Sequence, residues 1–160
     1  MPRIEILLRE QSLVLLSDDG KELGRYSVST SRNGAGELEG SFCTPRGAHV
    51  VRAKIGAGQP FNAVFRGRRP TGEIWTAELG ERFPGRDWIL TRILWLSGCE
   101  IGRNRLGKVD TMRRYIYIHG SPDTVPMGKP GSIGCIRMQN HDIVELFERV
   151  PAGTAVNIAA

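Results

Sequence analysis

The sequence predicts a single, mainly β domain over residues 1–160, with one or two short helices. Three observations favour this class. The chain is long enough to bury one hydrophobic core. Its 20 glycines and 9 prolines imply many turns. Its apolar segments are mostly as short as strands, and one segment near the C-terminus shows a helical period.

The first thirty residues predict a β-meander. Residues 3–9 and 12–16 are short apolar segments, and the polar residues between them indicate a break or bulge. The stretch SDDGK at 17–21 is typical of a turn, in which Gly20 can adopt positive φ. Residues 22–30 are expected to form the returning strand.

The next segment alternates between loop and strand. Residues 31–40 predict a loop, and residues 44–56 predict a strand with Val50 and Ile55 in the core. Residues 56–75 are rich in glycine and lack a period, so we expect an irregular loop there. Such a loop can lie beside a functional site.

Two more strands follow. WILTRILWLSG at 88–98 is the most apolar stretch of the chain, and its length and closing glycine favour a buried strand over a helix. Cys99 comes directly after it and is expected to belong to the core. RRYIYIHG at 113–120 is rich in β-branched and aromatic residues and predicts another strand.

The C-terminal helix is predicted from four apolar residues at i, i+3, i+4 and i+7, namely Ile143, Leu146, Phe147 and Val150. Asn140 is a suitable N-cap, and Asp142 in the first turn suits the helix dipole. Pro151 ends the helix, and residues 154–158 predict a closing strand.

The net charge of +5 and a pI near 9.5 favour an anionic partner. The densest basic clusters are RGRR at 66–69 and GRNRLGK at 102–108, and no stacking aromatic residues flank them. A solvated basic face is therefore favoured, and we expect no nucleic-acid site.

Three cysteines are an odd number, which favours free thiols in a reducing compartment over a disulfide framework. Charged residues interrupt the first apolar segment, which lacks the features of a signal peptide. No stretch approaches 18 apolar residues, so no membrane span is expected. These features predict a cytoplasmic protein, or a periplasmic or extracytoplasmic one if the export signal lies outside this sequence.

The stretch YIYIHGSPDTVPMGKPGSIGCIRMQNHDIVELF at 115–147 contains Cys135 and His119, each next to a glycine. A nucleophilic cysteine reacts as a thiolate, so its pKa must be lowered by a neighbouring histidine or a helix N-terminus. Cys135 lies five residues before the predicted N-cap Asn140. The segment between His119 and Cys135 is rich in Pro and Gly, which predicts a loop that folds back and joins its two ends.

Neighbouring residues have plausible roles in such a site. The amides of Gly134 and Cys135 can point at a developing oxyanion. The Gly120 carbonyl can accept from one imidazole nitrogen and leave the other facing the thiol. Ser132 can hydrogen-bond within the loop or to a substrate. Arg137 can bind a substrate carboxylate or pair with a structural acid.

A structural interpretation competes with this one, because cysteine is often a small buried hydrophobe and a histidine at a strand end is often structural. Cys43 fits either interpretation. The histidines and cysteines show no metal-binding spacing, so we expect no metal and no other cofactor.

At this point the sequence resembles a known family. The pattern IHG followed by SIGCIRM, Asn140 and Asp142 is similar to the catalytic signature of the L,D-transpeptidase (YkuD-type) family. STSRNGAGELEGSFCTPRGAH, LTRILWLSG and VPAGTAVNI are similar to other stretches of that family, so the likeness runs from about residue 12 to the end.

The resemblance implies a mixed sheet or sandwich and a cysteine enzyme that acts on peptidoglycan stem peptides. In this family pattern Cys135 is the nucleophile, His119 the base, and Gly120 the residue that orients the imidazole. Ser132, Gly134 and Arg137 then occupy positions that shape the oxyanion and substrate pocket; these three residues complete the candidate site.

The reaction implied is attack on the carbonyl of the diamino acid at stem position three, with release of the terminal D-alanine. Members commonly have His where this chain has Ile133. Because that difference affects the handling of the acceptor, we expect water to release the thioester, as in an L,D-carboxypeptidase. The alternatives are a true L,D-transpeptidase that forms 3–3 cross-links or exchanges D-amino acids, a non-catalytic wall-binding module, and a nucleic-acid-binding β domain.

Overall fold

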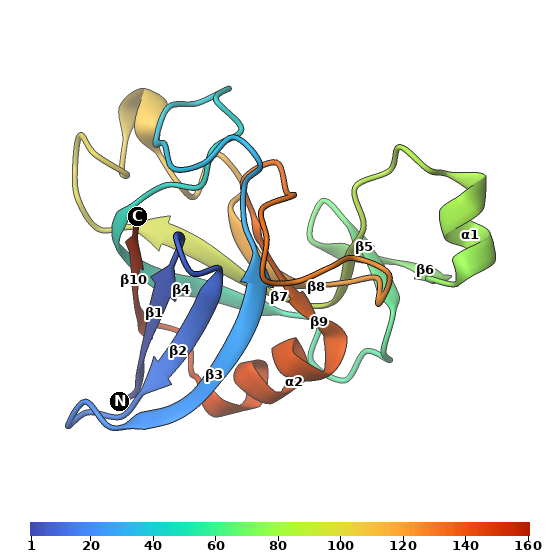
Figure 1. Cartoon of the computed structure of the whole chain (residues 1–160), viewed down its shortest axis with the longest axis horizontal. Helices are drawn as coiled ribbons and strands as arrows, with labels where there is room; N and C mark the ends of the chain where they lie inside the picture. The colour runs from blue at the N-terminus through green and yellow to red at the C-terminus, as the bar shows by residue number, and fades with distance from the viewer.

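The computed structural model describes residues 1–160 and shows a mainly β protein with two α-helices (Figure 1). The elements are β1 (Arg3–Leu7), β2 (Ser12–Leu16), β3 (Glu22–Ser29), β4 (Gly47–Ile55), β5 (Ala63–Arg66), β6 (Arg69–Ile74), α1 (Ala77–Arg82), β7 (Ile89–Gly98), the 3-10 turn η1 (Gly107–Val109), β8 (Tyr117–Ser121), β9 (Ile136–Gln139), α2 (Asn140–Arg149) and β10 (Ala155–Ala159). The predicted fold class is confirmed.

All ten strands belong to one mixed sheet, in the order β4-β10-β1-β2-β3-β9-β8-β7-β5-β6. Because β4 also pairs with β7, the sheet closes on itself. Most neighbours are antiparallel, but β1 pairs with β10 and β8 with β9 in parallel. The β5–β6 hairpin and α1 extend to one side of the closed part (Figure 1).

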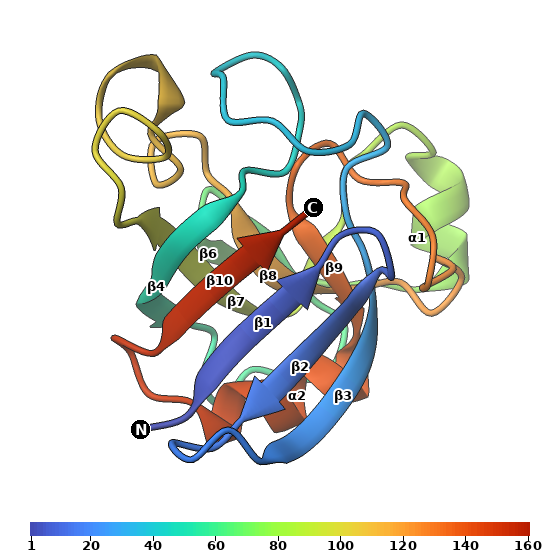
Figure 2. The same ribbon diagram turned by 60° about the vertical axis from the view of Figure 1, so that its left-hand side comes forward.

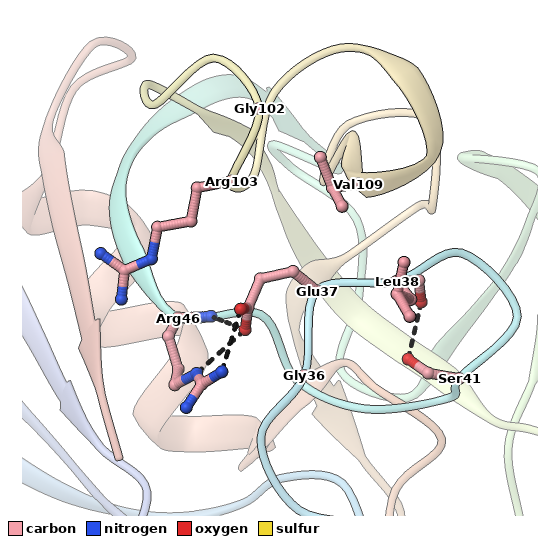
Figure 3. Close-up of a pocket in the computed structure, with 8 residues that line it drawn as sticks. All are labelled: Gly36, Glu37, Leu38, Ser41, Arg46, Gly102, Arg103 and Val109. Carbon is pink, nitrogen blue, oxygen red and sulfur yellow. Dashed lines mark hydrogen bonds and ion pairs between the residues drawn. The ribbon is translucent and has the colours of Figure 1, made fainter.

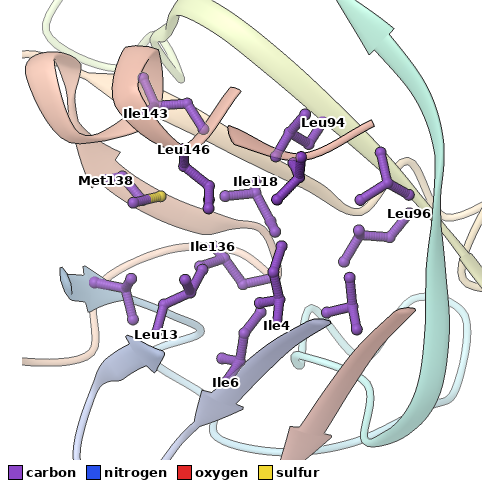
Figure 4. Packing of buried hydrophobic residues seen from close by; sticks show 14 of the residues in the cluster. Ile4, Ile6, Leu13, Leu94, Leu96, Ile118, Ile136, Met138, Ile143 and Leu146 are labelled. Carbon is purple, nitrogen blue, oxygen red and sulfur yellow. The ribbon is translucent and has the colours of Figure 1, made fainter. Parts of the chain in front are cut away.

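The main core lies between the strands and α2. Alternate residues of the strands point inward, as the two-residue period of a strand requires. The core contains 19 buried residues, among them the ten labelled in Figure 4: Ile4, Ile6, Leu13, Leu94, Leu96, Ile118, Ile136, Met138, Ile143 and Leu146. The predicted helical stripe of α2 is confirmed, since its apolar residues all join this cluster.

The meander predicted for the first thirty residues is confirmed as β1, β2 and β3, and the strand predicted at the C-terminus is β10 (Figure 2). The apolar segment at 88–98 is confirmed as β7, the longest strand. It pairs with β8 on one side and with β4 and β5 on the other. Both of its faces are apolar because Leu94 and Leu96 belong to the main core, whereas Ile93 and Trp95 pack in a second cluster.

The core residues predicted for β4 were partly wrong. Val50 is half-buried, whereas its neighbour Val51 is buried. His49 and Val51 point inward, and a register shift after Val51 ends the alternation. Ile55 is only partly buried and packs against a separate small cluster.

The prediction of an irregular loop at 56–75 was wrong, because β5 and β6 form a hairpin there. The hairpin turns at Gly67 and Arg68, whose φ angles of 56° and 65° are those of a tight primed turn. Glycine and Pro70 obscured the strand pattern. Proline is tolerated on β6 because this strand is at the edge of the sheet.

The strand predicted at 113–120 starts later than expected, at Tyr117. The residues before it form turns, and Tyr115 has a φ of 57°. The core prediction for Cys99 was also wrong. β7 ends at Gly98, and Cys99 begins the next loop with an exposed side chain.

Asn140 is the first residue of α2 and not its N-cap. Gln139 occupies the N-cap position, without a side-chain capping bond. The Asn140 side chain instead reaches across to β7, where its Oδ1 accepts a 2.7 Å hydrogen bond from Thr91 Oγ1.

Candidate active site

The parallel pair of β8 and β9 forms the base of the candidate site. The Pro- and Gly-rich loop between them folds back, as predicted, so that Ile118 lies opposite Ile136 and His119 lies opposite Arg137. Cys135 stands directly before β9 and packs against the small cluster that contains Tyr117. The structure therefore places His119 on β8 and Cys135 directly before the neighbouring strand β9.

His119 is 1% exposed and is oriented by the residue that follows it. Its Nδ1 lies 2.6 Å from the Gly120 carbonyl oxygen. A carbonyl can only accept, so Nδ1 carries the proton and Nε2 is the unprotonated nitrogen. Nε2 is buried and has no hydrogen-bond partner in the protein. A base with a free lone pair in a buried position is available for proton transfer.

The Cys135 thiol is half-buried and makes two hydrogen bonds to the chain just before β8 and at its start. Sγ donates to the Tyr115 carbonyl oxygen at 3.4 Å and accepts from the Tyr117 N–H at 3.3 Å. Burial raises the pKa of Cys135 to about 12, although the Tyr117 bond acts in the opposite direction.

The expected pKa lowering by a helix N-terminus does not occur. β9 separates Cys135 from α2 by four strand residues, and a strand of that length spans roughly 13 Å. The field of a helix terminus falls off within its first turn. The expectation was wrong because a strand, and not a loop, connects the cysteine to the helix.

Burial also lowers the pKa of His119, while the Asp87 carboxylate and the Gly120 hydrogen bond raise it. Burial therefore disfavours the charged form of both Cys135 and His119. These shifts favour a neutral thiol and a neutral imidazole in the resting protein.

Ser132 and Gly134 hold the loop in front of Cys135. Ser132 Oγ donates to the Cys135 carbonyl oxygen at 2.6 Å and accepts from the Gly134 N–H at 3.2 Å. Of the two amides expected at an oxyanion, that of Gly134 is thus already occupied. The Cys135 N–H donates no hydrogen bond within the chain.

Arg137 is half-buried and makes no ion pair with an acid. Its Nη2 donates to Ser29 Oγ at 3.2 Å, and its buried Nε has no partner. Burial lowers the pKa of Arg137, but arginine keeps its charge in proteins. The guanidinium therefore retains donors for a further acceptor.

A pocket of about 490 Å³ opens at Cys135. Its walls are mostly apolar, and three large side chains at its rim remain exposed: Phe42, Tyr115 and Ile133. Three charged residues, Arg68, Asp87 and Arg114, line the same pocket. An apolar pocket with a few polar groups is typical of a ligand site.

Arg68 comes from the tip of the β5–β6 hairpin and is held tightly. Its guanidinium lies 4.7 Å from the Trp95 ring centre and 4.8 Å from that of Tyr115, and Nη1 donates to Tyr117 Oη at 3.0 Å. A solvated basic face was therefore the wrong prediction for this arginine, because aromatic residues distant in sequence stack on it. The segment 56–75 does lie beside the site, as expected.

Arg114 connects the pocket to the loop that precedes β4. Its guanidinium donates to the carbonyl oxygens of Gly36, Glu37 and Cys43, the last at 2.6 Å. Thr44 Oγ1, from the same loop, donates to the Gly134 carbonyl oxygen at 2.9 Å. These bonds support the residue that precedes the cysteine. The thiol of Cys43 itself does not line the pocket.

Asp87 is the one acidic residue among those that line this pocket, and it makes no ion pair. It raises the pKa values of both His119 and Cys135. Arg68, Asp87 and Arg114 were not predicted from the sequence, because each lies in a turn or loop without a periodic signal. Tyr117 could have been predicted, because residues two apart on a strand lie on the same face and Tyr117 lies two residues before His119.

A second pocket, of about 390 Å³, lies between the loop before β4 and the loop after β7 (Figure 3). Here the charges are paired with one another. Glu37 accepts from Arg46 Nε and Nη2, both at 3.0 Å, and Arg103 contacts Glu100 at 3.3 Å.

No group of three or more His, Cys, Asp or Glu side chains is arranged to hold a metal ion. None of the helices is both long and apolar enough to cross a bilayer.

Comparison with known proteins shows the family to which the chain belongs. The YkuD family, described as the L,D-transpeptidase catalytic domain, matches residues 1–158, so the chain belongs to this family. The chain is 29% identical over 157 residues to the L,D-transpeptidase-family protein YqjB of Bacillus subtilis (strain 168), which covers 98% of this chain and 70% of YqjB. It is 46% identical to YkuD of the same organism over 89 residues, which are 56% of this chain and 44% of YkuD.

Solved structures share the fold. A mutant L,D-transpeptidase of Enterococcus faecium aligns with a TM-score of 0.59 and 18% identity, covering 99% of this chain and 49% of that one. L,D-transpeptidase 3 of Mycobacterium tuberculosis, in complex with a faropenem-derived adduct, aligns with a TM-score of 0.60 and 16% identity, covering 99% of this chain and 61% of that one. The chain therefore spans about half to two thirds of these structures. The resemblance seen in the sequence is confirmed at the level of family and fold.

Proposed function

We propose that this chain is a cysteine enzyme that cleaves the bond between the position-three diamino acid and the terminal D-alanine of peptidoglycan tetrapeptide stems. Cys135 is the nucleophile and His119 the base. Water releases the product, so the activity is that of an L,D-carboxypeptidase.

The proposal rests on one observation: Nε2 of His119 is buried and has no hydrogen-bond partner in the protein. Buried polar atoms normally have partners, and an exception calls for an explanation. The Gly120 carbonyl holds the proton on Nδ1 and leaves Nε2 bare on the strand beside Cys135. A structural histidine would be expected to bond through both nitrogens, as His49 does with Gly47 and Thr111.

The first step follows from the charge state of this pair. The neutral Cys135 thiol gives its proton to Nε2 of His119 as Sγ attacks the carbonyl carbon of the diamino acid. The carbonyl oxygen becomes an oxyanion, and the free Cys135 N–H is a donor for it. No thiolate–imidazolium pair needs to exist beforehand, which agrees with a thiol pKa of about 12.

The remaining steps return every proton. The tetrahedral intermediate collapses to a thioester, and the departing amine of D-alanine takes the proton from His119 Nε2. His119 then accepts a proton from water as the water oxygen attacks the thioester. Collapse of the second intermediate releases a tripeptide acid and restores the thiol with the proton from His119.

Hydrolysis is favoured by the residue at position 133. Ile133 is exposed at the rim of the pocket, at a position where the family pattern that the sequence resembles commonly has His. Together with Phe42 and Tyr115 it makes this part of the rim apolar, without a polar side chain at 133 to hold an acceptor amine.

Transpeptidation is the alternative, and Asp87 favours it. An unpaired carboxylate that lines the Cys135 pocket attracts a cationic amine, and an amine that reaches the thioester gives a 3–3 cross-link or a D-amino acid exchange product. The two activities share the acylation step and differ only in the acceptor.

The test is mass spectrometry of the protein incubated with a disaccharide tetrapeptide. We expect loss of D-alanine to give a tripeptide, and no loss in Cys135→Ala. Cys99→Ala is the matched control, because that thiol is exposed and far along the chain from the site. It should retain full activity.

A D-amino acid added at increasing concentration separates the two acceptors. A product that stays tripeptide supports the carboxypeptidase, and an exchanged tetrapeptide supports the transpeptidase. A carbapenem-type β-lactam provides an independent probe of the thiol. If no stem reacts and the drug leaves Cys135 unmodified, the catalytic proposal is wrong.

A further inference from the structure

Strand β7 contains an irregularity directly beside His119. Gly120 lies opposite Leu90 and His119 lies opposite Ile93, so Thr91 and Arg92 have no partner on β8. Thr91 has a φ of 74°, which is unusual and costly for a β-branched residue. Such bulges are common beside active sites, where they redirect the backbone.

Three side chains from separate segments hold this bulge. Thr91 Oγ1 accepts from the Asn62 N–H at 3.0 Å and donates to Asn140 Oδ1 at 2.7 Å. Asn140 Nδ2 then donates to Asn62 Oδ1 at 2.8 Å. The ring of bonds is directional. Because the Asn62 N–H can only donate, the Thr91 hydroxyl must give its proton to Asn140.

Charge also stabilises the bulge from outside. The Thr91 carbonyl oxygen leaves the ladder and accepts from Arg92 Nη1 at 2.6 Å, and the same nitrogen donates to the Gln59 carbonyl oxygen at 2.7 Å. Thr91 is fully buried. Several hydrogen bonds thus hold one strained residue in place.

The network packs closely against Gly120. A Cβ atom at this position would lie 2.4 Å from Asn140 Oδ1 and 2.6 Å from the Leu90 carbonyl oxygen, closer than any side chain permits. Asn140 and the bulged strand therefore both pack closely against Gly120, on the side where a side chain would project. The carbonyl of this same glycine accepts the His119 Nδ1–H at 2.6 Å.

We propose that Thr91 is a positioning residue for His119: through Asn140 it holds the Gly120 peptide so that the Gly120 carbonyl accepts from Nδ1 and Nε2 stays unprotonated. Asn62 completes the ring that fixes the Asn140 amide. The proposal deepens the proposed function, because the tautomer matters for catalysis only if His119 is the base.

The tautomer itself is measured without any substrate. Histidine side-chain ¹H–¹⁵N NMR of the intact protein should show His119 as a single Nδ1–H form. In Thr91→Val, which keeps the shape but lacks the hydroxyl, we expect an Nε2–H population of His119 and a rate of Cys135 acylation by a carbapenem lower by about tenfold or more. The acid limb of that rate should move to lower pH, because the Gly120 bond raises the pKa of His119 and would be weakened.

Two controls separate positioning from general damage. Thr91→Ser restores the hydroxyl and should restore both the tautomer and the rate to within about twofold. His49 is a reference in the same spectrum, since its partners Gly47 and Thr111 lie outside the network and its signals should not change.

Thr91→Gly tests the proposal if Thr91→Val fails to fold. Glycine adopts the positive φ without strain, while the hydroxyl is still lost. It should show the same mixed tautomer as Thr91→Val. A single Nδ1–H form in folded Thr91→Val or Thr91→Gly overturns the proposal. If the wild-type protein is not acylated at all, the proposed function fails, yet the tautomer still decides the role of Thr91.

Discussion

The two pockets on either side of the loop before β4 differ in how their charges are satisfied. In the pocket of Figure 3 the Glu37 carboxylate meets Arg46 at 3.0 Å on both oxygens. At the Cys135 site the polar groups are not paired in this way. Asp87 is exposed, lines the Cys135 pocket and makes no ion pair. Nε2 of His119 and Nε of Arg137, which lie on the neighbouring strands β8 and β9, are buried and have no hydrogen-bond partner in the protein.

This difference points to the Cys135 site as the place for a ligand. Unpaired buried polar groups cost free energy, so the two buried nitrogens without partners, His119 Nε2 and Arg137 Nε, call for an explanation. Under the proposed function, a substrate carboxylate supplies an acceptor for Arg137, and Nε2 of His119 receives the proton of Cys135. Four substitutions test this difference, in decreasing order of the effect we expect.

His119→Gln should reduce kcat/KM for tetrapeptide cleavage by roughly 10²- to 10⁴-fold, because the general base is lost. The release of D-alanine measures the rate. His141→Gln is the control, since His141 is mostly exposed at the start of α2 and should act like the wild type. A His119 variant with more than a tenth of the wild-type rate would exclude this histidine as the base.

Arg68→Ala removes the guanidinium that joins the hairpin tip to Trp95, Tyr115 and Tyr117. We expect KM to rise roughly tenfold with a smaller change in kcat, because the pocket wall loosens while Cys135 keeps its place. Arg69→Ala, on the same hairpin but exposed, should leave steady-state kinetics unchanged. Equal losses in both variants would argue for a general effect of charge.

Asp87→Asn should lower the pKa values of the titratable groups at the site. The carboxylate raises the pKa values of Cys135 and His119, so its removal lowers both. The rate of Cys135 alkylation, followed against pH by mass spectrometry, should rise at lower pH than in the wild type. Asp123→Asn, exposed in the loop between β8 and β9, is the control and should not move the profile. An Asp87→Asn profile that overlays the wild type would show that this carboxylate does not act on the thiol.

Glu37→Gln should leave activity unchanged and lower the melting temperature by only a few degrees, because its partner is largely exposed. Arg46 lowers the pKa of Glu37. The pair therefore stabilises the fold above the ordinary pKa of a glutamate, and the contribution is lost as the pH falls through the lower folded value. Thermal melts at pH 7 and at pH 3 check this, since the difference in melting temperature between variant and wild type should be smaller at the lower pH.

Much of the fold was predictable because strands and α2 carry their period in the sequence. β7 was recognised from its continuous apolar run, its length and its closing glycine, and the stripe of α2 from apolar residues at helical spacing. The β5–β6 hairpin was missed because glycine and proline hide a strand when it lies at a sheet edge and turns through Gly67. Cys99 was misplaced because hydrophobicity near a strand end does not say whether the strand stops before it.

The sequence alone was sufficient to recognise the family and the mainly β class, and to predict Cys135, His119 and Gly120 as site residues, because all three belong to one short motif. Their surroundings depend on the tertiary structure. Arg68, Asp87 and Thr91 come from other strands and loops, and the pairing of β7 with β8 and with β5 brings these segments to the site. Burial disfavours the charged forms of the thiol and the imidazole, and burial is a property of the whole packed chain that no local stretch of sequence encodes.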